Sequence, residues 1–107
     1  MTLQQKRRAL AEACPGIFTI GKNSGMVRWK DTGEDVTERE WLYAVHLAEG
    51  TLEQHYQVVE YGIEVLKAIE CTEKISVEGE PNWGKLIHAT ESQRIDAFLK
   101  VKGLWKE

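Results

Sequence analysis

Residues 51–70 read TLEQHYQVVEYGIEVLKAIE and carry the longest helical pattern in the chain. Apolar side chains recur there at steps of four and three residues, which is the spacing of one face of an α-helix. Five residues make up this stripe: Leu52, Tyr56, Val59, Ile63 and Leu66. Three further apolar residues widen it: Val58, Val65 and Ile69. The pattern therefore predicts a helix over about residues 52–70 that is buried on more than one side.

The long helix opens with a start signal that three segments after the hairpin share. Thr37, Thr51 and Thr90 each begin the pattern Thr-x-x-Glu/Gln. In this capping box the Thr hydroxyl accepts a hydrogen bond from the backbone N–H three residues on, and the Glu or Gln side chain accepts one from the Thr N–H. Each box precedes helical periodicity, so the sequence predicts three capped helices. Their approximate ranges are residues 38–49, 52–70 and 91–101.

The two shorter helices each have an apolar face and a glycine stop. Gly50 follows the first and Gly103 follows the last, and glycine is common just after a helix. The residues expected to be buried are Trp41, Val45 and Ala48 in the first helix, and Ile95, Phe98 and Leu99 in the last. Beyond the last helix we expect Leu104 and Trp105 to pack back on it.

The first 30 residues predict a short helix and then a β-hairpin. The helix covers about residues 2–13 and stops before Pro15, because proline disfavours a helical conformation in the residue before it. β-Branched and aromatic residues over 17–20 and 26–29 predict two strands. The Asn- and Gly-containing segment 22–25 favours a tight turn between them.

Between the long helix and the last one the signals are weaker. Residues 75–77 predict a short strand, 80–84 a turn-rich loop, and 86–88 a short apolar run. The fold class we expect is α+β: a short N-terminal helix, a β-hairpin, then a predominantly helical part with three capped helices. With 107 residues, the chain has the length of one compact domain, residues 1–107.

Composition excludes several classes of protein. Hydrophobic residues make up 42% and charged residues 29%, which is typical of a globular chain. Cys14 and Cys71 each stand apart in sequence, so we expect reduced thiols rather than a disulfide scaffold. No apolar run reaches the length of a signal-peptide core or a membrane span. The sequence therefore predicts a cytoplasmic protein that does not enter a membrane.

The charges are unevenly distributed along the chain. Residues 1–30 carry six basic side chains against one acidic. Residues 31–64 carry nine acidic side chains against one basic, and residues 65–107 carry seven of each sign. The chain thus has a basic start, an acidic middle and a neutral end.

No motif for catalysis or metal binding occurs in the sequence. His46, His55 and His88 do not have the i, i+4 spacing of a helical metal site, and no cysteine lies close to any of them in sequence. Neither the nucleophile elbow GxSxG nor the phosphate loop GxxxxGK[ST] is present. We therefore predict a chain that is not an enzyme and that uses no cofactor and no metal.

The acidic middle is the most distinctive functional signal. A surface of one sign speeds and orients the approach of a partner of opposite sign. The chain is therefore expected to bind another protein, and the residues predicted to contact it are Glu34, Asp35, Glu38, Glu53, Glu60 and Glu64. The simpler interpretation is that these carboxylates form only a solvated face of two amphipathic helices.

Nucleic-acid binding is the alternative function. Its contacts would come from the basic start and the hairpin, namely Lys6, Arg7, Arg8, Arg28, Trp29 and Lys30. Trp29 could stack on a base, or it could pack in the core under the helices. The long helix has a net negative charge and would repel phosphates, so it does not fit the recognition helix of a helix-turn-helix.

The C-terminal segment resembles a tail found in small accessory proteins of tailed phages and prophages. Residues 88–105 read HATESQRIDAFLKVKGLW, and such tails have the form Ala-Thr-x-x-Gln-Arg-x-x-Ala-Leu/Phe-Leu-x-x-x-Gly-x-Trp. The run at residues 38–43 is also similar to such proteins. The resemblance implies an early-region phage protein, a class rich in small inhibitors of host defence or host nucleases. It implies a host protein as partner and the host cytoplasm as location, and it assigns no catalytic residue. Self-association is a further hypothesis, in which surplus apolar surface on the long helix would pair two copies.

Overall fold

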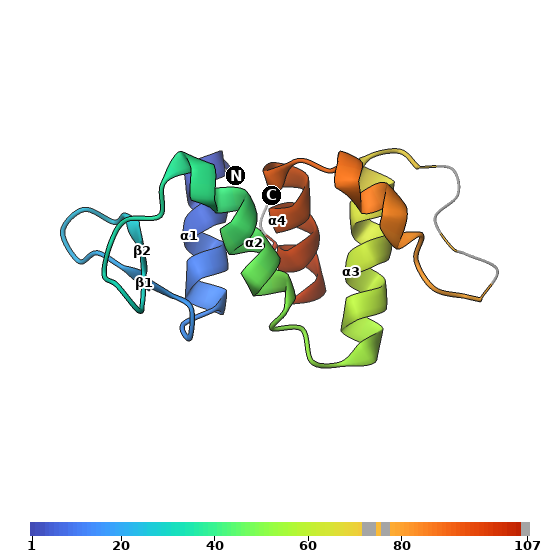
Figure 1. Cartoon of the computed structure of the whole chain (residues 1–107), viewed down its shortest axis with the longest axis horizontal. Helices are drawn as coiled ribbons and strands as arrows, with labels where there is room; N and C mark the ends of the chain where they lie inside the picture. Colours follow the sequence, from blue (N-terminus) through green and yellow to red (C-terminus); the bar gives the residue numbers. More distant parts are fainter. Residues whose placement is uncertain (72–74, 76–77, 106–107) are drawn as a thin grey trace. The chain divides into compact units, whose positions relative to one another are not determined.

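The computed structural model describes residues 1–71, 75 and 78–105. Within them the chain forms α-helices, short 3-10 helices and one two-stranded antiparallel hairpin (Figure 1). The predicted α+β class, with helices dominating, is confirmed. The described elements fall into two units, unit 1 over Met1–Thr51 and unit 2 over Leu52–Trp105. The single domain over residues 1–107 stays a prediction.

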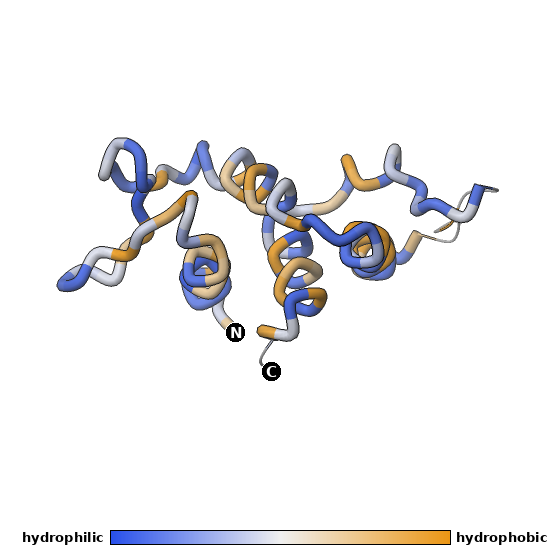
Figure 2. The backbone as a smooth tube through the Cα atoms, turned by 90° about the horizontal axis from the view of Figure 1, so that it is seen from below, coloured by the Kyte–Doolittle hydropathy of each residue, from blue (hydrophilic) through white to orange (hydrophobic). Residues whose placement is uncertain are grey.

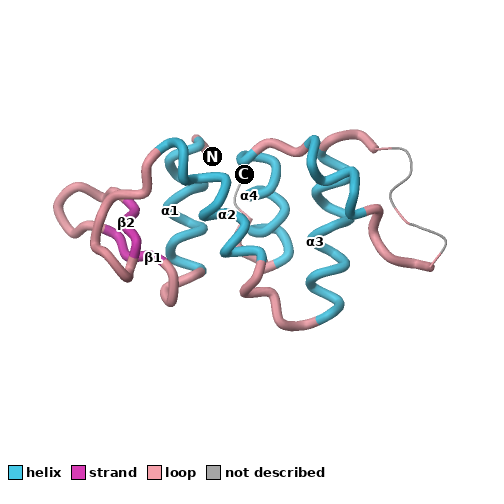
Figure 3. The backbone as a smooth tube through the Cα atoms, in the orientation of Figure 1, coloured by secondary structure: helices cyan, strands magenta, loops and turns pink. Residues whose placement is uncertain are grey.

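Unit 1 begins with the predicted helix and hairpin. Helix α1 spans Leu3–Ala13, and Thr2 caps it in a box with Gln5. Strands β1 (Phe18–Ile20) and β2 (Val27–Trp29) pair antiparallel, as Figure 3 shows in magenta. The predicted hairpin is therefore confirmed.

The helix predicted over residues 38–49 is confirmed, with a tighter first turn. A 3-10 turn, η1 (Glu38–Glu40), leads into α2 (Trp41–Glu49). The backbone N–H and the hydroxyl of Thr37 both donate to the Glu40 carboxylate, at 3.0 and 2.8 Å. The expected face of Trp41, Val45 and Ala48 is buried.

The core of unit 1 contains stacked aromatic rings and one charged side chain. The Phe18 ring lies between Trp41 and Trp29, with centroid distances of 6.2 and 5.5 Å. The Arg7 guanidinium lies 4.8 Å from the centre of the Trp41 ring. Arg7 is only 3% exposed. Among the residues that the structure describes, it is the one charged residue that is buried. The aliphatic stem of an arginine packs on apolar surface, and the charged end of Arg7 is met by the Trp41 ring and by Glu38.

In unit 2 the start of the long helix differs from the prediction. Helix α3 spans His55–Ala68, with Gln54 as its N-cap, so the capping box at Thr51 is wrong. The Thr51 hydroxyl instead donates to the backbone carbonyl of Ala48 at 2.7 Å. This bond places the Thr51 side chain at the end of α2 rather than at the start of α3.

The apolar stripe predicted on residues 52–70 is confirmed only in part, since Leu52, Val65 and Leu66 are buried but other members are not. The buried residues of the helix are Tyr61, Gly62, Val65 and Leu66, whereas Tyr56 is 60% exposed. The buried face therefore lies on the Val65 side of the predicted arc and extends beyond it to Tyr61 and Gly62. Figure 2 shows apolar and polar residues alternating around α3 and α4.

Gly62 explains why the buried face extends to this side of the helix. A Cβ at this position would lie 2.7 Å from the Trp83 ring and 2.8 Å from the Pro81 Cβ. Only glycine lets the segment around Pro81 and Trp83 pack so closely on α3. Trp83 begins the 3-10 helix η2 (Trp83–His88), which replaces the predicted loop and apolar run. Ile75 bridges Pro81, and the rest of the strand predicted over 75–77 lies outside the described residues.

The last predicted helix is confirmed at both ends. Helix α4 spans Glu91–Val101, and Thr90 and Gln93 form the expected capping box. Gly103 has a φ of 72°, and the Leu104 N–H bonds to the Leu99 carbonyl at 2.8 Å, which is a Schellman stop. The expected face of the helix, Ile95, Phe98 and Leu99, is fully buried. Helix α4 packs along α3 to form the main contact of unit 2.

Candidate functional site: a groove between α3 and α4

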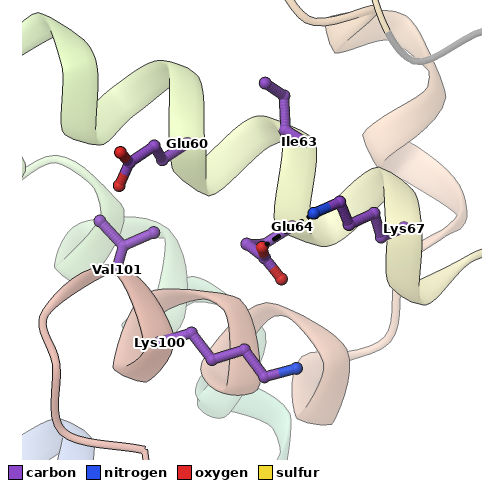
Figure 4. A pocket seen from close by; sticks show the side chains of 6 residues that line it. All are labelled: Glu60, Ile63, Glu64, Lys67, Lys100 and Val101. Atoms are coloured by element: carbon purple, nitrogen blue, oxygen red, sulfur yellow. Dashed lines mark hydrogen bonds and ion pairs between the residues drawn. The ribbon is translucent and has the colours of Figure 1, made fainter.

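A groove of about 270 Å³ lies along the contact between α3 and α4. Four residues of α3 and two of α4 line it: Glu60, Ile63, Glu64, Lys67, Lys100 and Val101. Figure 4 shows the Glu60 and Glu64 carboxylates on the side of α3 that faces α4, with Val101 across from Glu60. All six residues belong to unit 2, so the groove is formed within one unit.

The two carboxylates of the groove are four residues apart on one helix. Like charges at this spacing repel one another. Glu64 has a cation beside it, since Lys67 Nζ lies 3.4 Å from its Oε1. Among the described residues no ion pair involves Glu60. Glu60 therefore presents a charge to solvent at the edge of the groove.

The opposite wall combines an apolar and a basic residue of α4. Val101 is partly exposed and faces Glu60 (Figure 4). Lys100 Nζ lies 5.2 Å from the centre of the Trp105 ring, a distance at which an ammonium is attracted to the ring face. The Lys100 charge is thus directed toward Trp105.

An exposed tyrosine lies one turn before the groove. Tyr56 is 60% exposed and precedes Glu60 by four residues, so the two side chains share one face of α3. Glu53 lies three residues before Tyr56 and is also exposed. Tyr56 is therefore flanked along the chain by two exposed carboxylates.

The other three predicted acidic residues lie in unit 1, where two of them form ion pairs. Arg7 Nη1 and Nη2 donate to the two carboxylate oxygens of Glu38 at 2.7 and 3.0 Å. This hydrogen bond, and then the charge of Arg7, lower the pKa of Glu38 below its ordinary value of 4.5. Arg28 Nε donates to Asp35 at 3.1 Å, and Glu34 is exposed. The six carboxylates are thus divided between the two units.

The predicted nucleic-acid contacts are only partly at the surface. Arg7 is buried, and Arg28 is paired with Asp35. Trp29 is half-buried and stacks on Phe18, so the core interpretation describes it better than an open platform for a base. The remaining three differ in exposure, with Arg8 and Lys30 exposed and Lys6 partly exposed. The pairing of Arg7 and Arg28 lowers the positive charge available to phosphates.

The described residues contain no group of three His, Cys, Asp or Glu side chains that could hold a metal ion. Two histidines lie near single carboxylates: His46 Nδ1 is 3.8 Å from Glu49, and His55 Nε2 is 3.4 Å from Glu80. Cys14 is buried and Cys71 is partly exposed, both as free thiols. Every helix in the described ranges is too short or too polar to cross a bilayer.

Comparison with protein-family models, with curated proteins and with solved structures finds no match for this chain. Its function is therefore inferred from the geometry of its own residues.

The sequence predicted a surface role for two of the six residues that line the groove. It identified Glu60 and Glu64 as surface carboxylates, but assigned Ile63 to the buried stripe. It gave no role to Lys67, Lys100 or Val101, because the periodicity of one helix does not say which side meets a second helix. The only available signal was the width of the apolar arc on α3, which exceeds what one neighbouring helix can cover.

Proposed function

We propose that this chain is a non-enzymatic binding protein whose partner is another protein with a basic surface. The observation that supports it is Tyr56, 60% exposed on α3 and flanked by the exposed carboxylates Glu53 and Glu60. Tyrosine is enriched among the residues that dominate protein interfaces, and its rigid ring loses little entropy on binding. The carboxylates would attract and orient a basic partner.

The acidic surface in this proposal is narrower than the one inferred from charge counts. Glu38 and Asp35 already neutralise Arg7 and Arg28, so they contribute less to steering. Glu53, Glu60 and Glu64 in unit 2 are the carboxylates assigned to the partner. The similarity of residues 88–105 to tails of phage accessory proteins favours a host protein as the partner, met in the host cytoplasm.

Site-specific photo-crosslinking tests this proposal. The photoreactive residue p-benzoylphenylalanine replaces Tyr56 in cells that make the protein, and crosslinked products are identified by mass spectrometry. Tyr43 on α2 is the matched control, because it is 59% exposed and lies in unit 1. We expect one dominant protein adduct from position 56. An equal set of adducts from both positions, or none from position 56, would contradict the proposal.

Charge reversal then tests the role of the carboxylates. With the captured partner purified, the double variant Glu53→Lys/Glu60→Lys is expected to slow association about tenfold at low salt. Glu12→Lys is the control, since Glu12 is an exposed carboxylate on α1 of unit 1. An unchanged association rate for the double variant would mean that the carboxylates only keep the surface solvated.

A further inference from the structure

We propose that the groove between α3 and α4 accepts one arginine side chain of the partner protein, with its guanidinium between Glu60 and Glu64. This inference rests on the proposed function and names the chemistry of the partner at one site. Three features of the groove support it: the arrangement of the carboxylates, the apolar wall and the size of the space.

The first feature is a pair of like charges of which only Glu64 has a cation beside it. Glu60 and Glu64 lie one helical turn apart and both project toward α4 (Figure 4). Lys67 Nζ lies 3.4 Å from Glu64, and no ion pair within the described residues involves Glu60. A guanidinium is planar and offers five N–H donors, so it can bridge two carboxylates that a single ammonium cannot satisfy.

The second feature is the apolar wall opposite Glu60. Val101 of α4 lines the groove together with Ile63 of α3, and both are partly exposed. An arginine buries its aliphatic stem on apolar surface while its charged end reaches polar groups. The combination of Val101 and Glu60 on facing walls matches these two parts of one side chain.

The third feature is the size of the space. The groove measures about 270 Å³, slightly below the roughly 300 to 1,000 Å³ that small-molecule and cofactor sites occupy. A single long side chain is therefore a better occupant than a metabolite or a cofactor. Lys67 is the internal competitor for Glu64, and its side chain is 57% exposed, so it can swing into solvent when an arginine enters.

Methyl-detected NMR of the full chain provides the test, with N-acetyl-arginine methylamide as the probe. We expect saturable shifts of the Val101 and Ile63 methyl signals with the arginine probe and none with the uncharged citrulline analogue. Glu60→Gln is expected to weaken binding of the arginine probe about tenfold, because a hydrogen bond to a charged group is lost. Lys67→Met is expected to tighten binding several-fold by freeing Glu64. Glu12→Gln serves as the control and leaves the dissociation constant unchanged.

Three results would overturn the inference: equal shifts with arginine and citrulline, equal affinity for Glu60→Gln and the wild-type chain, or weaker binding by Lys67→Met. Backbone spectra of each variant establish that it is folded. The outcome is separable from that of the proposed function. If position 56 still crosslinks one partner while the arginine probe fails, the chain binds a protein but the groove does not take its arginine.

Discussion

The carboxylates of unit 1 and those of unit 2 come from one acidic stretch of sequence but have different surroundings. In unit 1, Glu38 is held by both ends of the Arg7 guanidinium, and Asp35 is bonded to Arg28. Glu40 accepts from Thr37. In unit 2, Glu53 and Glu60 are exposed, and no ion pair involves either within the described residues. Glu38 and Asp35 therefore each pair with an arginine of unit 1, whereas Glu53 and Glu60 present their charge at the surface of unit 2.

The cores of the two units also differ in whether they contain a charged side chain. Unit 1 buries Arg7 against Trp41 beside stacked rings. The fully buried large side chains of unit 2 are apolar: Phe98, Leu66, Ile95, Leu99, Val65 and Pro81. A buried cation requires a carboxylate, whereas an apolar core requires none. The buried Arg7 therefore accounts for the engagement of Glu38 in unit 1.

The largest effect is expected on removal of the buried cation. Arg7→Ala loses the packed stem, the contact with Trp41 and two charged hydrogen bonds, so we expect unit 1 to lose about 2 to 3 kcal/mol of stability. Urea unfolding and amide exchange of α1 measure this loss. Arg8→Ala is the control at the neighbouring exposed position and should change stability by less than about 0.5 kcal/mol. Similar values for both variants would show that the buried pair is not structural.

Gly62→Ala tests the packing of unit 2. Alanine is a better helix former than glycine by roughly 1 kcal/mol, but its Cβ would meet Trp83 and Pro81 at 2.7 and 2.8 Å. Overpacking of this kind costs about 1 to 3 kcal/mol, so we expect a net loss of about 1 kcal/mol. Gly84→Ala is the matched control, since nothing lies within 4 Å of the added Cβ there. A more stable Gly62→Ala chain would contradict the close contact.

A substitution at the end of α3 should stabilise unit 2. Glu70 has a φ of 56°, and the Cys71 N–H bonds to the Leu66 carbonyl at 2.9 Å, so Glu70 occupies the left-handed position of a Schellman stop. Glu70→Gly removes the steric cost of that conformation and is expected to add up to about 1 kcal/mol. Denaturant unfolding measures it. Gly103→Ala, at the matching position after α4, is expected to have the opposite sign.

The smallest expected effect is a dependence of unit 1 on acid pH. Hydrogen bonds from Arg7 lower the pKa of Glu38, and the backbone N–H of Thr37 is the main cause of the lowered pKa of Glu40. A pKa lowered on folding adds stability above the unfolded value, near 4.5, and this stability is lost as the pH falls through the folded value. Amide exchange of α1 measures the loss of stability of unit 1 below pH 4.5. We expect this loss to be smaller in Glu38→Gln and unchanged in Glu60→Gln.

Local signals in the sequence were sufficient for most of the elements. The box at Thr90 and the stop at Gly103 define α4 at both ends. The box at Thr37 marks the start of η1 and α2. These signals work because the bonds they predict join residues three to five positions apart, so no distant contact is needed.

The buried face of α3 and the lining of the groove were decided only by tertiary contacts. The sequence favoured the stripe with Tyr56 and Ile63, but Pro81 and Trp83 pack at Gly62 instead. The acidic stretch determined that carboxylates would be plentiful, and the fold determined which ones meet a cation. Charge is a property of each residue, whereas pairing depends on which distant segment folding brings within about 4 Å of it.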